Sequence, residues 1–379
     1  MNSQSPEQAR LERLLRFLEQ DPANLSLLGD AARAAYEAGD PGLAAKLLER
    51  HTSAAPLPGA LVNLQGLIAI GQNRFGDAAE IFERLRALEG DNSALRFNLA
   101  WCRALLNDYQ GALDLLDEET LAASSRAPAL KIEMMHHLEK YEEGLTCGEQ
   151  LAARFPGNQA LMGALATLAM DAERIDLARK YAAQAGENPE GQAALGMLTL
   201  GDHDAKHSLE LFEQALARQP GNARAWVGKG LSLLVSGDVA GATQAIDKGA
   251  ELFQDHLGSW VASGWAHFVA GDYAKARASF ERALAADPNF AEIHGGLAVL
   301  DIIDGKIDEA KRRTDIALRL DKKCFGAALA KSMLLQRSGH EQMAQKIRDI
   351  ALSQPVGPNG ETIAQALVGF SSGLAGRRN

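Results

Sequence analysis

The sequence contains little cysteine, few aromatic residues and no long hydrophobic run. Its three cysteines, Cys102, Cys147 and Cys324, form no CxxC pair, which argues against a zinc site or a disulfide framework and fits a reducing compartment. No stretch approaches eighteen uninterrupted apolar residues, so no membrane-spanning helix is expected. The first residues also lack the basic and then apolar segments of a secretory signal. These absences predict a cytoplasmic protein that does not insert into a membrane.

The sequence also has fewer basic than acidic residues. The 39 lysines and arginines are outnumbered by 49 aspartates and glutamates, so the formal net charge is −10. Such a balance is unfavourable for a general binder of nucleic acids or anionic membranes. The short basic stretches at residues 10–16 and 311–313 have the pattern of solvated faces of amphipathic helices. No nucleic-acid partner is therefore expected.

What the sequence does contain is a period of 34 residues. Trp226 and Trp260 stand 34 residues apart, and each is followed by a glycine, a small anchor and a large core residue at the same offsets. Such a period indicates stacked helical hairpins. The anchor is the small residue that begins the packing stripe of the second helix in each hairpin, and it recurs ten times, at Ala44, Ala78, Ala112, Gly144, Ala178, Ser208, Ala242, Ala276, Ala310 and Ala344.

We call the first and second helix of each hairpin helix A and helix B. Each repeated position has a physical reason. The residue four after an anchor lies one helical turn further and fills the core, as at Phe82, Phe212 and Phe280. Proline stops helix B before the next hairpin. A residue able to adopt the left-handed conformation ends helix A in the turn, at Gly39, Asn73, Asn107, Gly237, Gly271, Gly305 and Gly339.

These positions resemble those of the tetratricopeptide repeat family. The resemblance covers about residues 21–356 and is fullest over residues 257–290. It implies an all-α fold, an α-solenoid wound as a right-handed superhelix of about ten helical hairpins with capping helices at its ends. The composition favours a bacterial source.

Two irregular spacings between anchors and the two terminal segments set the expected domain boundaries. The anchors Ala178 and Ser208 are only 30 residues apart, so we expect a short helix B in the fifth hairpin and a change of path near Asn188–Pro189. A milder defect falls around residues 122–127. The expected domains are an N-terminal capping helix at 1–20, repeats one to five at 21–188, repeats six to ten at 189–356, and a C-terminal helix and tail at 357–379.

The resemblance also implies which side chains face a partner, because helix A lines the inner surface of such a solenoid. That surface is almost uncharged from the sixth hairpin onward, and a contiguous apolar surface marks an interaction site. We therefore expect it to hold an apolar or amphipathic helical segment of a partner protein. The expected groove residues are Phe97, Trp101, Met197, Leu200, Val227, Leu231, Leu234, Val261, Trp265, Phe268, Val299, Ile302, Leu329 and Met333.

Other occupants of this groove stay open. The apolar residues 363–374 of the chain itself could fill it, or a second copy could cover it in a homo-oligomer. A carboxylate clamp of the kind that some family members use is not expected. Its asparagine is matched by Asn98 and a basic residue by Arg126, but Leu130 stands where a second basic residue is needed.

No motif for catalysis, a cofactor or a metal is present. His203 and His207 are four residues apart, with Asp202 and Asp204 nearby. They fall in the turn of the sixth hairpin and no third ligand is evident, so surface turn residues are expected rather than a metal site. The chain is therefore expected not to be an enzyme. The main hypothesis is a protein-interaction scaffold or adaptor. The alternatives are a chaperone or assembly factor of a bacterial secretion or surface-structure system, and a noncatalytic regulatory subunit of an enzyme complex.

Overall fold

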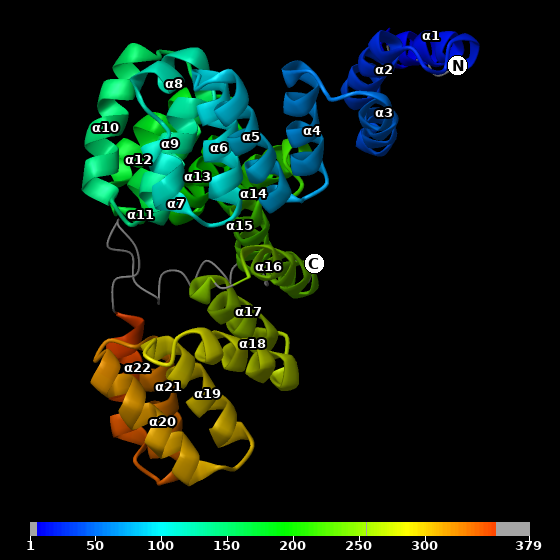
Figure 1. Ribbon diagram of the computed structural model, residues 1–379. Coiled ribbons are helices and arrows are strands. Elements are labelled where there is room, and N and C mark those ends of the chain that lie inside the picture. Colours follow the sequence, from blue (N-terminus) through cyan, green and yellow to red (C-terminus); the bar gives the residue numbers. More distant parts are fainter. Residues whose placement is uncertain (1–5, 255, 354–379) are drawn as a thin grey trace. The chain divides into compact units, whose positions relative to one another are not determined.

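The computed structural model describes residues 6–254 and 256–353 of the chain. These residues form twenty-two α-helices, and no β-strand occurs among them. The all-α architecture expected from the 34-residue period is confirmed. The helices gather into two compact units, residues 1–154 and 155–379, which are coloured blue to teal and green to red in Figure 1.

Unit 1 begins with helix α1 (Pro6–Gln20), which packs against the first hairpin through Leu11 and Leu18. Helix A and helix B of each hairpin then alternate along the chain. The four hairpins are α2 (Leu25–Glu37) with α3 (Pro41–Ala54), α4 (Gly59–Gly71) with α5 (Phe75–Glu89), α6 (Ser93–Leu105) with α7 (Tyr109–Asp114) and α8 (Glu118–Ala123), and α9 (Ala127–His137) with α10 (Tyr141–Arg154).

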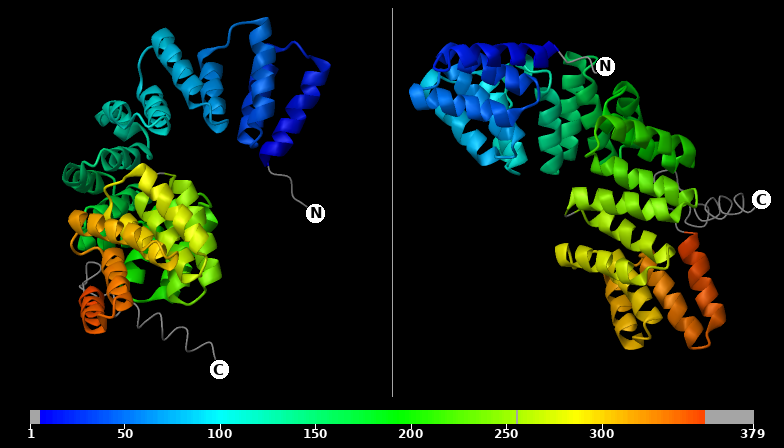
Figure 2. Two further views of the ribbon diagram at one scale, coloured as in Figure 1. Left: turned by 90° about the horizontal axis from the view of Figure 1, so that it is seen from below. Right: turned by 90° about the vertical axis from the view of Figure 1, so that its right-hand side faces the viewer.

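Unit 2 contains six further hairpins, each packed on the next (Figure 2). The expected C-terminal helix in residues 357–379 lies outside the described residues. The hairpins are α11 (Gln159–Asp171) with α12 (Ile175–Gln184), α13 (Pro189–Gly201) with α14 (Ala205–Arg218), α15 (Ala223–Val235) with α16 (Val239–Phe253), α17 (Leu257–Val269) with α18 (Tyr273–Ala286), α19 (Ala291–Ile303) with α20 (Ile307–Leu320), and α21 (Phe325–Arg337) with α22 (Glu341–Leu352).

A left-handed residue ends helix A in all ten hairpins. The seven glycines and asparagines expected at this position all have positive φ. The other three hairpins place Glu139, Glu173 and His203 there, with φ of 56°, 57° and 67°. The sequence pattern missed this role for the two glutamates, because neither is a residue type that favours the left-handed region.

Phenylalanine at the core position of helix B packs against glycines of helix A. A Cβ added to Gly264 would lie 2.7 Å from the ring of Phe280, and one added to Gly296 in the following hairpin would lie 2.5 Å from it. Phe212 has the same relation to Gly196 and Gly228. Phe280 and Phe212 are 0% exposed. The close crossings therefore depend on the absence of a side chain on helix A.

The irregular spacings have structural counterparts. Helix α12 has 10 residues, whereas helix B of the next hairpin, α14, has 14, so the expected short helix is confirmed. In the third hairpin, helix B is broken into α7 and α8, and Asp117 caps α8 by accepting the Thr120 N–H. The units divide between Arg154 and Phe155. The expected break near Asn188 falls inside unit 2.

Helices α11 and α13 pack closely across that expected break. A Cβ added to Gly163 on α11 would lie 3.2 Å from the backbone nitrogen of Gly191 on α13, and 2.1 Å from Oδ1 of Asn188. Asn188 caps α13 by accepting the N–H groups of Glu190 and Gly191. The glycines thus keep the fifth and sixth hairpins together where the spacing shortens.

Candidate partner-binding surface

An apolar surface is formed in unit 2 by helix A of three successive hairpins. Trp265 and Phe268 on α17 pack with Leu329 and Met333 on α21 around a buried cluster that includes Val299 and Ile302 of α19. We call these six residues the helix-A surface. Its four outer members are half-buried, so they meet both the core and the solvent.

Trp265 is the centre of this surface. Its ring centroid lies 5.5 Å from Phe268, 5.5 Å from Phe280 and 6.0 Å from Phe325, in edge-to-face arrangements. Such pairs contribute on the order of 0.5–1.5 kcal/mol each beyond burial. These contacts fix the position of the Trp265 ring on the surface.

The expected groove residues differ in how far the chain itself covers them. Val261, Val299 and Ile302 are 8%, 0% and 3% exposed. They serve the packing of unit 2, and a ligand would touch them only slightly. The half-buried members are Phe97 and Trp101 in unit 1 and Met197, Leu200, Val227, Leu231, Leu234, Trp265, Phe268, Leu329 and Met333 in unit 2.

Some of the half-buried members also contribute to packing between helices. Met197 packs against the cluster around Phe212. Val227 lies against α16, since a Cβ added to Gly249 would be 2.6 Å from its Cγ2. The sixth and seventh hairpins therefore use part of this apolar character internally.

Sequence reasoning missed three exposed apolar residues at the ends of helices near this surface. Val269 is 47% exposed, Tyr273 is 42% exposed and Ile303 is 40% exposed. Tyr273 continues the aromatic contacts, with its ring 5.7 Å from Phe268. Val269 and Ile303 each directly follow an expected groove residue, but consecutive helix residues do not share a face, so the helical pattern held no signal for them.

Ionisable groups beside this surface have partners on helices of the same or the neighbouring hairpin. His267 Nε2 lies 2.9 Å from Asp247 Oδ2, and Asp301, which is 1% exposed, pairs with Arg277 at 2.8 Å and Arg313 at 3.0 Å. His267 and Asp301 occupy the helix-A position where the family pattern has tyrosine. Their burial leaves the apolar character of the surface intact.

The groove residues of unit 1 have a more polar setting. Phe97 and Trp101 lie 6.3 Å apart, and the Arg126 guanidinium stacks over Trp101 at 5.8 Å. Asn98 donates to Asn63 at 3.2 Å. Leu130, at the position where a carboxylate clamp needs a second basic residue, is an uncharged side chain that is only 2% exposed.

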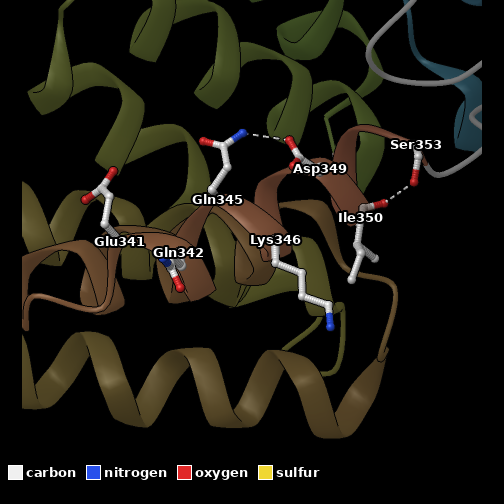
Figure 3. A pocket seen from close by; sticks show the side chains of 7 residues that line it. All are labelled: Glu341, Gln342, Gln345, Lys346, Asp349, Ile350 and Ser353. Atoms are coloured by element: carbon white, nitrogen blue, oxygen red, sulfur yellow. Dashed lines mark hydrogen bonds between the residues drawn. The ribbon is translucent and has the colours of Figure 1, made fainter.

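The outer face of α22 forms an open hollow of about 630 Å³. Figure 3 shows Gln345 and Asp349 on one side of the helix and Lys346 and Ile350 on the other. Gln345 donates to Asp349 at 2.7 Å, and the Ser353 hydroxyl donates to the Ile350 carbonyl at 2.8 Å. Most of the lining residues have polar or charged side chains and come from one helix, so the hollow has the character of a solvated helix face.

Two of the three cysteines are buried thiols with raised pKa values. Burial raises the pKa of the Cys102 thiol to about 11, and burial together with the Glu292 carboxylate raises the pKa of Cys324. Thiols of this kind are poor nucleophiles at neutral pH. Among the described residues no group of three or more histidine, cysteine, aspartate or glutamate side chains could hold a metal ion. Nor is any described helix long and apolar enough to cross a bilayer.

Comparison with known proteins agrees with this architecture. Family models of the tetratricopeptide repeat match residues 63–128, 194–256 and 268–334, which together make up more than half of the chain. No curated protein matches the sequence. The fold is similar to that of a monomeric IFIT1 mutant with Gppp-AAAA, with a TM-score of 0.53 at 13% identity over 92% of this chain and 95% of that chain. The human IFIT1 dimer with m7Gppp-AAAA gives 0.52 at 14% identity over the same shares.

Proposed function

The chain belongs to the tetratricopeptide repeat family, and from that premise we propose that it is a noncatalytic scaffold whose helix-A surface holds an apolar or amphipathic segment of a partner protein. The family builds protein-interaction scaffolds, since stacked hairpins present one extended surface made of equivalent positions. The proposed setting is the cytoplasm. The proposed segment is a helix, because an amphipathic helix presents one apolar stripe to an apolar groove.

One observation carries this proposal. Trp265, Phe268, Leu329 and Met333 converge from two helices on one buried cluster and stay half-exposed. Aromatic residues and methionine are enriched at the centres of protein interfaces. Methionine also adapts its shape to different apolar partners. A rigid tryptophan beside an adaptable methionine is a favourable combination for anchoring an apolar side chain.

RNA is a weaker candidate ligand. The IFIT1 structures contain Gppp-AAAA or m7Gppp-AAAA, but at 13–14% identity the likeness concerns the fold. This chain has a net charge of −10, whereas phosphate binding draws on clustered lysine and arginine. The uncharged helix-A surface favours a protein segment.

Photo-crosslinking and a matched pair of methionine variants test the proposal. A photoreactive p-benzoylphenylalanine in place of Leu329 should crosslink to an apolar segment of another protein, identified by mass spectrometry. A synthetic peptide of that segment should then bind wild-type chain, and Met333→Asp should weaken its binding at least tenfold. Met343→Asp is the control, because Met343 is 56% exposed on α22 and lies outside the helix-A surface.

Each outcome decides the proposal. Equal loss in both methionine variants would show a nonspecific apolar contact. Crosslinks only to residues 354–379 of the same chain, or only to a second copy, would assign the surface to self-burial or to a homo-oligomer. Circular dichroism must show that Met333→Asp stays folded.

A further inference from the structure

The tenth hairpin lacks a side chain that the other nine have. The fourth residue of helix A is large in all the others, and in the tenth it is Ala328. The nine large residues are Leu28, Val62, Arg96, Leu130, Met162, Gln192, Trp226, Trp260 and His294.

In the three preceding hairpins this side chain makes one recurring contact with the chain before it. Trp226 Nε1 donates to the Pro220 carbonyl at 2.8 Å, Trp260 Nε1 to that of Gln254 at 2.6 Å, and His294 Nε2 to that of Pro288 at 2.7 Å. The acceptor is always six residues earlier. The corresponding acceptor in the tenth hairpin is the carbonyl of Lys322, which Ala328 cannot reach with any donor.

A hollow of about 190 Å³ occupies this place between α20, α21 and α22. It is lined by Leu318, Lys322, Lys323, Ala328, Lys331, Ile347, Ile350 and Ala351. We call it the Ala328 hollow. It is smaller than the roughly 300–1,000 Å³ of typical small-molecule sites, so its size suits one large side chain rather than a whole cofactor. It shares no residue with the helix-A surface.

The repeat itself indicates what would fit. In the seventh hairpin the Lys229 ammonium lies over the Trp226 ring at 5.9 Å. Lys331 stands at the equivalent position of the tenth hairpin, 102 residues later. An aromatic ring entering the Ala328 hollow would therefore meet Lys331 as Trp226 meets Lys229, a contact that favours aromatic over aliphatic groups.

The lysines at the rim of the Ala328 hollow indicate the charge of the residues that would flank such a ring. Lys322, Lys323 and Lys331 are all exposed, and no ion pair involves them within residues 6–254 and 256–353. The Asp321 carboxylate nearby accepts the backbone N–H of Lys323 at 2.8 Å. Three cations around an apolar hollow, on a chain of net charge −10, form a locally positive site that complements carboxylates.

We propose that the Ala328 hollow is a second docking site, which takes an aromatic side chain from an acidic segment of a partner protein. The ring replaces the missing helix-A side chain and lies against Lys331 and Ile350. An indole or phenol donor of that ring reaches the carbonyl of Lys322. Glutamates or aspartates flanking it pair with Lys322 and Lys323.

A fluorescein-labelled twelve-residue peptide tests this site on the full-length chain. The peptide carries one central tryptophan with two glutamates on each side and is followed by fluorescence polarisation. Its tryptophan-to-alanine and glutamate-to-lysine versions are the matched probes, and each should bind at least tenfold more weakly. Binding of the parent peptide should weaken in 0.5 M NaCl, because exposed charges are screened. No binding of the parent peptide at 100 µM overturns the proposal.

Three variants locate the binding. Ala328→Trp should place in the hollow the ring that Trp226 and Trp260 provide in earlier hairpins, with its hydrogen bond to the Lys322 carbonyl. This variant should have a higher thermal midpoint and bind the peptide at least tenfold more weakly. Lys331→Glu should also weaken binding about tenfold, whereas Lys248→Glu, an exposed lysine on α16, should change it less than twofold. A stabilised Ala328→Trp chain that binds the peptide unchanged would overturn the proposal.

Two further outcomes name other occupants. If the parent peptide binds only to the Phe370→Ala variant, the occupant of the hollow is the chain's own C-terminal segment. If indole-3-acetate binds as tightly as the peptide, the occupant is a small aromatic acid. Either overturns the proposal. Met333→Asp should leave peptide affinity unchanged, so the outcome here is independent of that for the helix-A surface.

Discussion

The indole nitrogen of Trp260 donates a hydrogen bond of 2.6 Å to the carbonyl oxygen of Gln254. Arg282 from helix B stacks over the same ring at 4.3 Å, and the residue is only 8% exposed. The tryptophan that marks the repeat in the sequence therefore holds helix A to the preceding chain. Trp265, which is proposed to face a partner, follows five residues later.

Replacing Trp260 should separate the contributions of its hydrogen bond and of its ring to the free energy of unfolding. Trp260→Phe keeps an aromatic ring but loses the donor, and should lower the free energy of unfolding by about 1 kcal/mol. Trp260→Ala leaves a cavity as well and should cost about 3–5 kcal/mol. Urea unfolding followed by circular dichroism measures both. Equal losses would show that the hydrogen bond carries the whole effect.

Gly264→Ala should destabilise unit 2 by about 1–3 kcal/mol, because the added methyl group would overlap the buried ring of Phe280. The added Cβ would lie 2.7 Å from that ring. Gly76→Ala on α5 is the control, since a Cβ there meets nothing within 4 Å. It should cost nothing, because alanine favours a helix more than glycine does. Similar losses in both variants, by urea unfolding, would contradict the packing argument.

Glu139→Gly should stabilise unit 1 by about 1 kcal/mol, because a left-handed backbone strains any residue with a Cβ. The φ of Glu139 is 56°, and Gly271 holds the equivalent place in the eighth hairpin with φ of 77°. The reverse change, Gly271→Ala, should destabilise by a similar amount. Thermal midpoints of the two variants should move in opposite directions, and a shift of the same sign in both would refute this.

Acid should weaken unit 2 through His256. The pKa of His256 is lowered, first because burial removes solvent from the imidazole and second because the Arg224 charge is nearby. The imidazole ring lies 4.7 Å from the ring of Phe253. Its neutral Nδ1 accepts the Ser259 N–H at 3.1 Å and caps α17. Because the folded pKa lies below the unfolded one, the stability is present above the unfolded pKa and is lost as pH falls through the folded pKa.

The variant His256→Asn should remove that part of the pH dependence while keeping the cap, since asparagine caps helices well and does not titrate. Thermal midpoints at pH 7.5 and pH 5.5 would show it. The wild-type chain should lose more between the two pH values than the variant does. The same loss in both would place the titrating group elsewhere.

Asp301→Ala should destabilise the ninth hairpin by about 2 kcal/mol, because it leaves two arginines without their buried partner. The loss is moderated because the side chains of Arg277 and Arg313 are 22% and 19% exposed and reach water. Asp308→Ala, which breaks only the exposed pair with Lys311, should have no measurable effect. Urea unfolding compares them, and equal stability of Asp301→Ala and wild type would refute the role given to this cluster.

Much of the fold could be predicted from the sequence because the contacts that define a hairpin join residues close along the chain. Ala276 and Phe280 share a helical turn, and Gly271 ends the helix just before it. The interaction surface was less predictable. Helical position alone placed Trp265, Val299 and Met333 on one face, but it gave no measure of how closely the neighbouring helices approach.

The sequence by itself determined ten hairpins, the residues that cross closely within each, and the apolar character of helix A, since these follow from local periodicity. Only the tertiary structure decided which of those apolar residues stay accessible. Gly295 and Gly326 bring α19 against α21, and a Cβ on Gly295 would lie 2.6 Å from the Ala327 nitrogen. That approach buries Val299 and Ile302, while the larger side chains of Trp265 and Met333 remain half-exposed beside them.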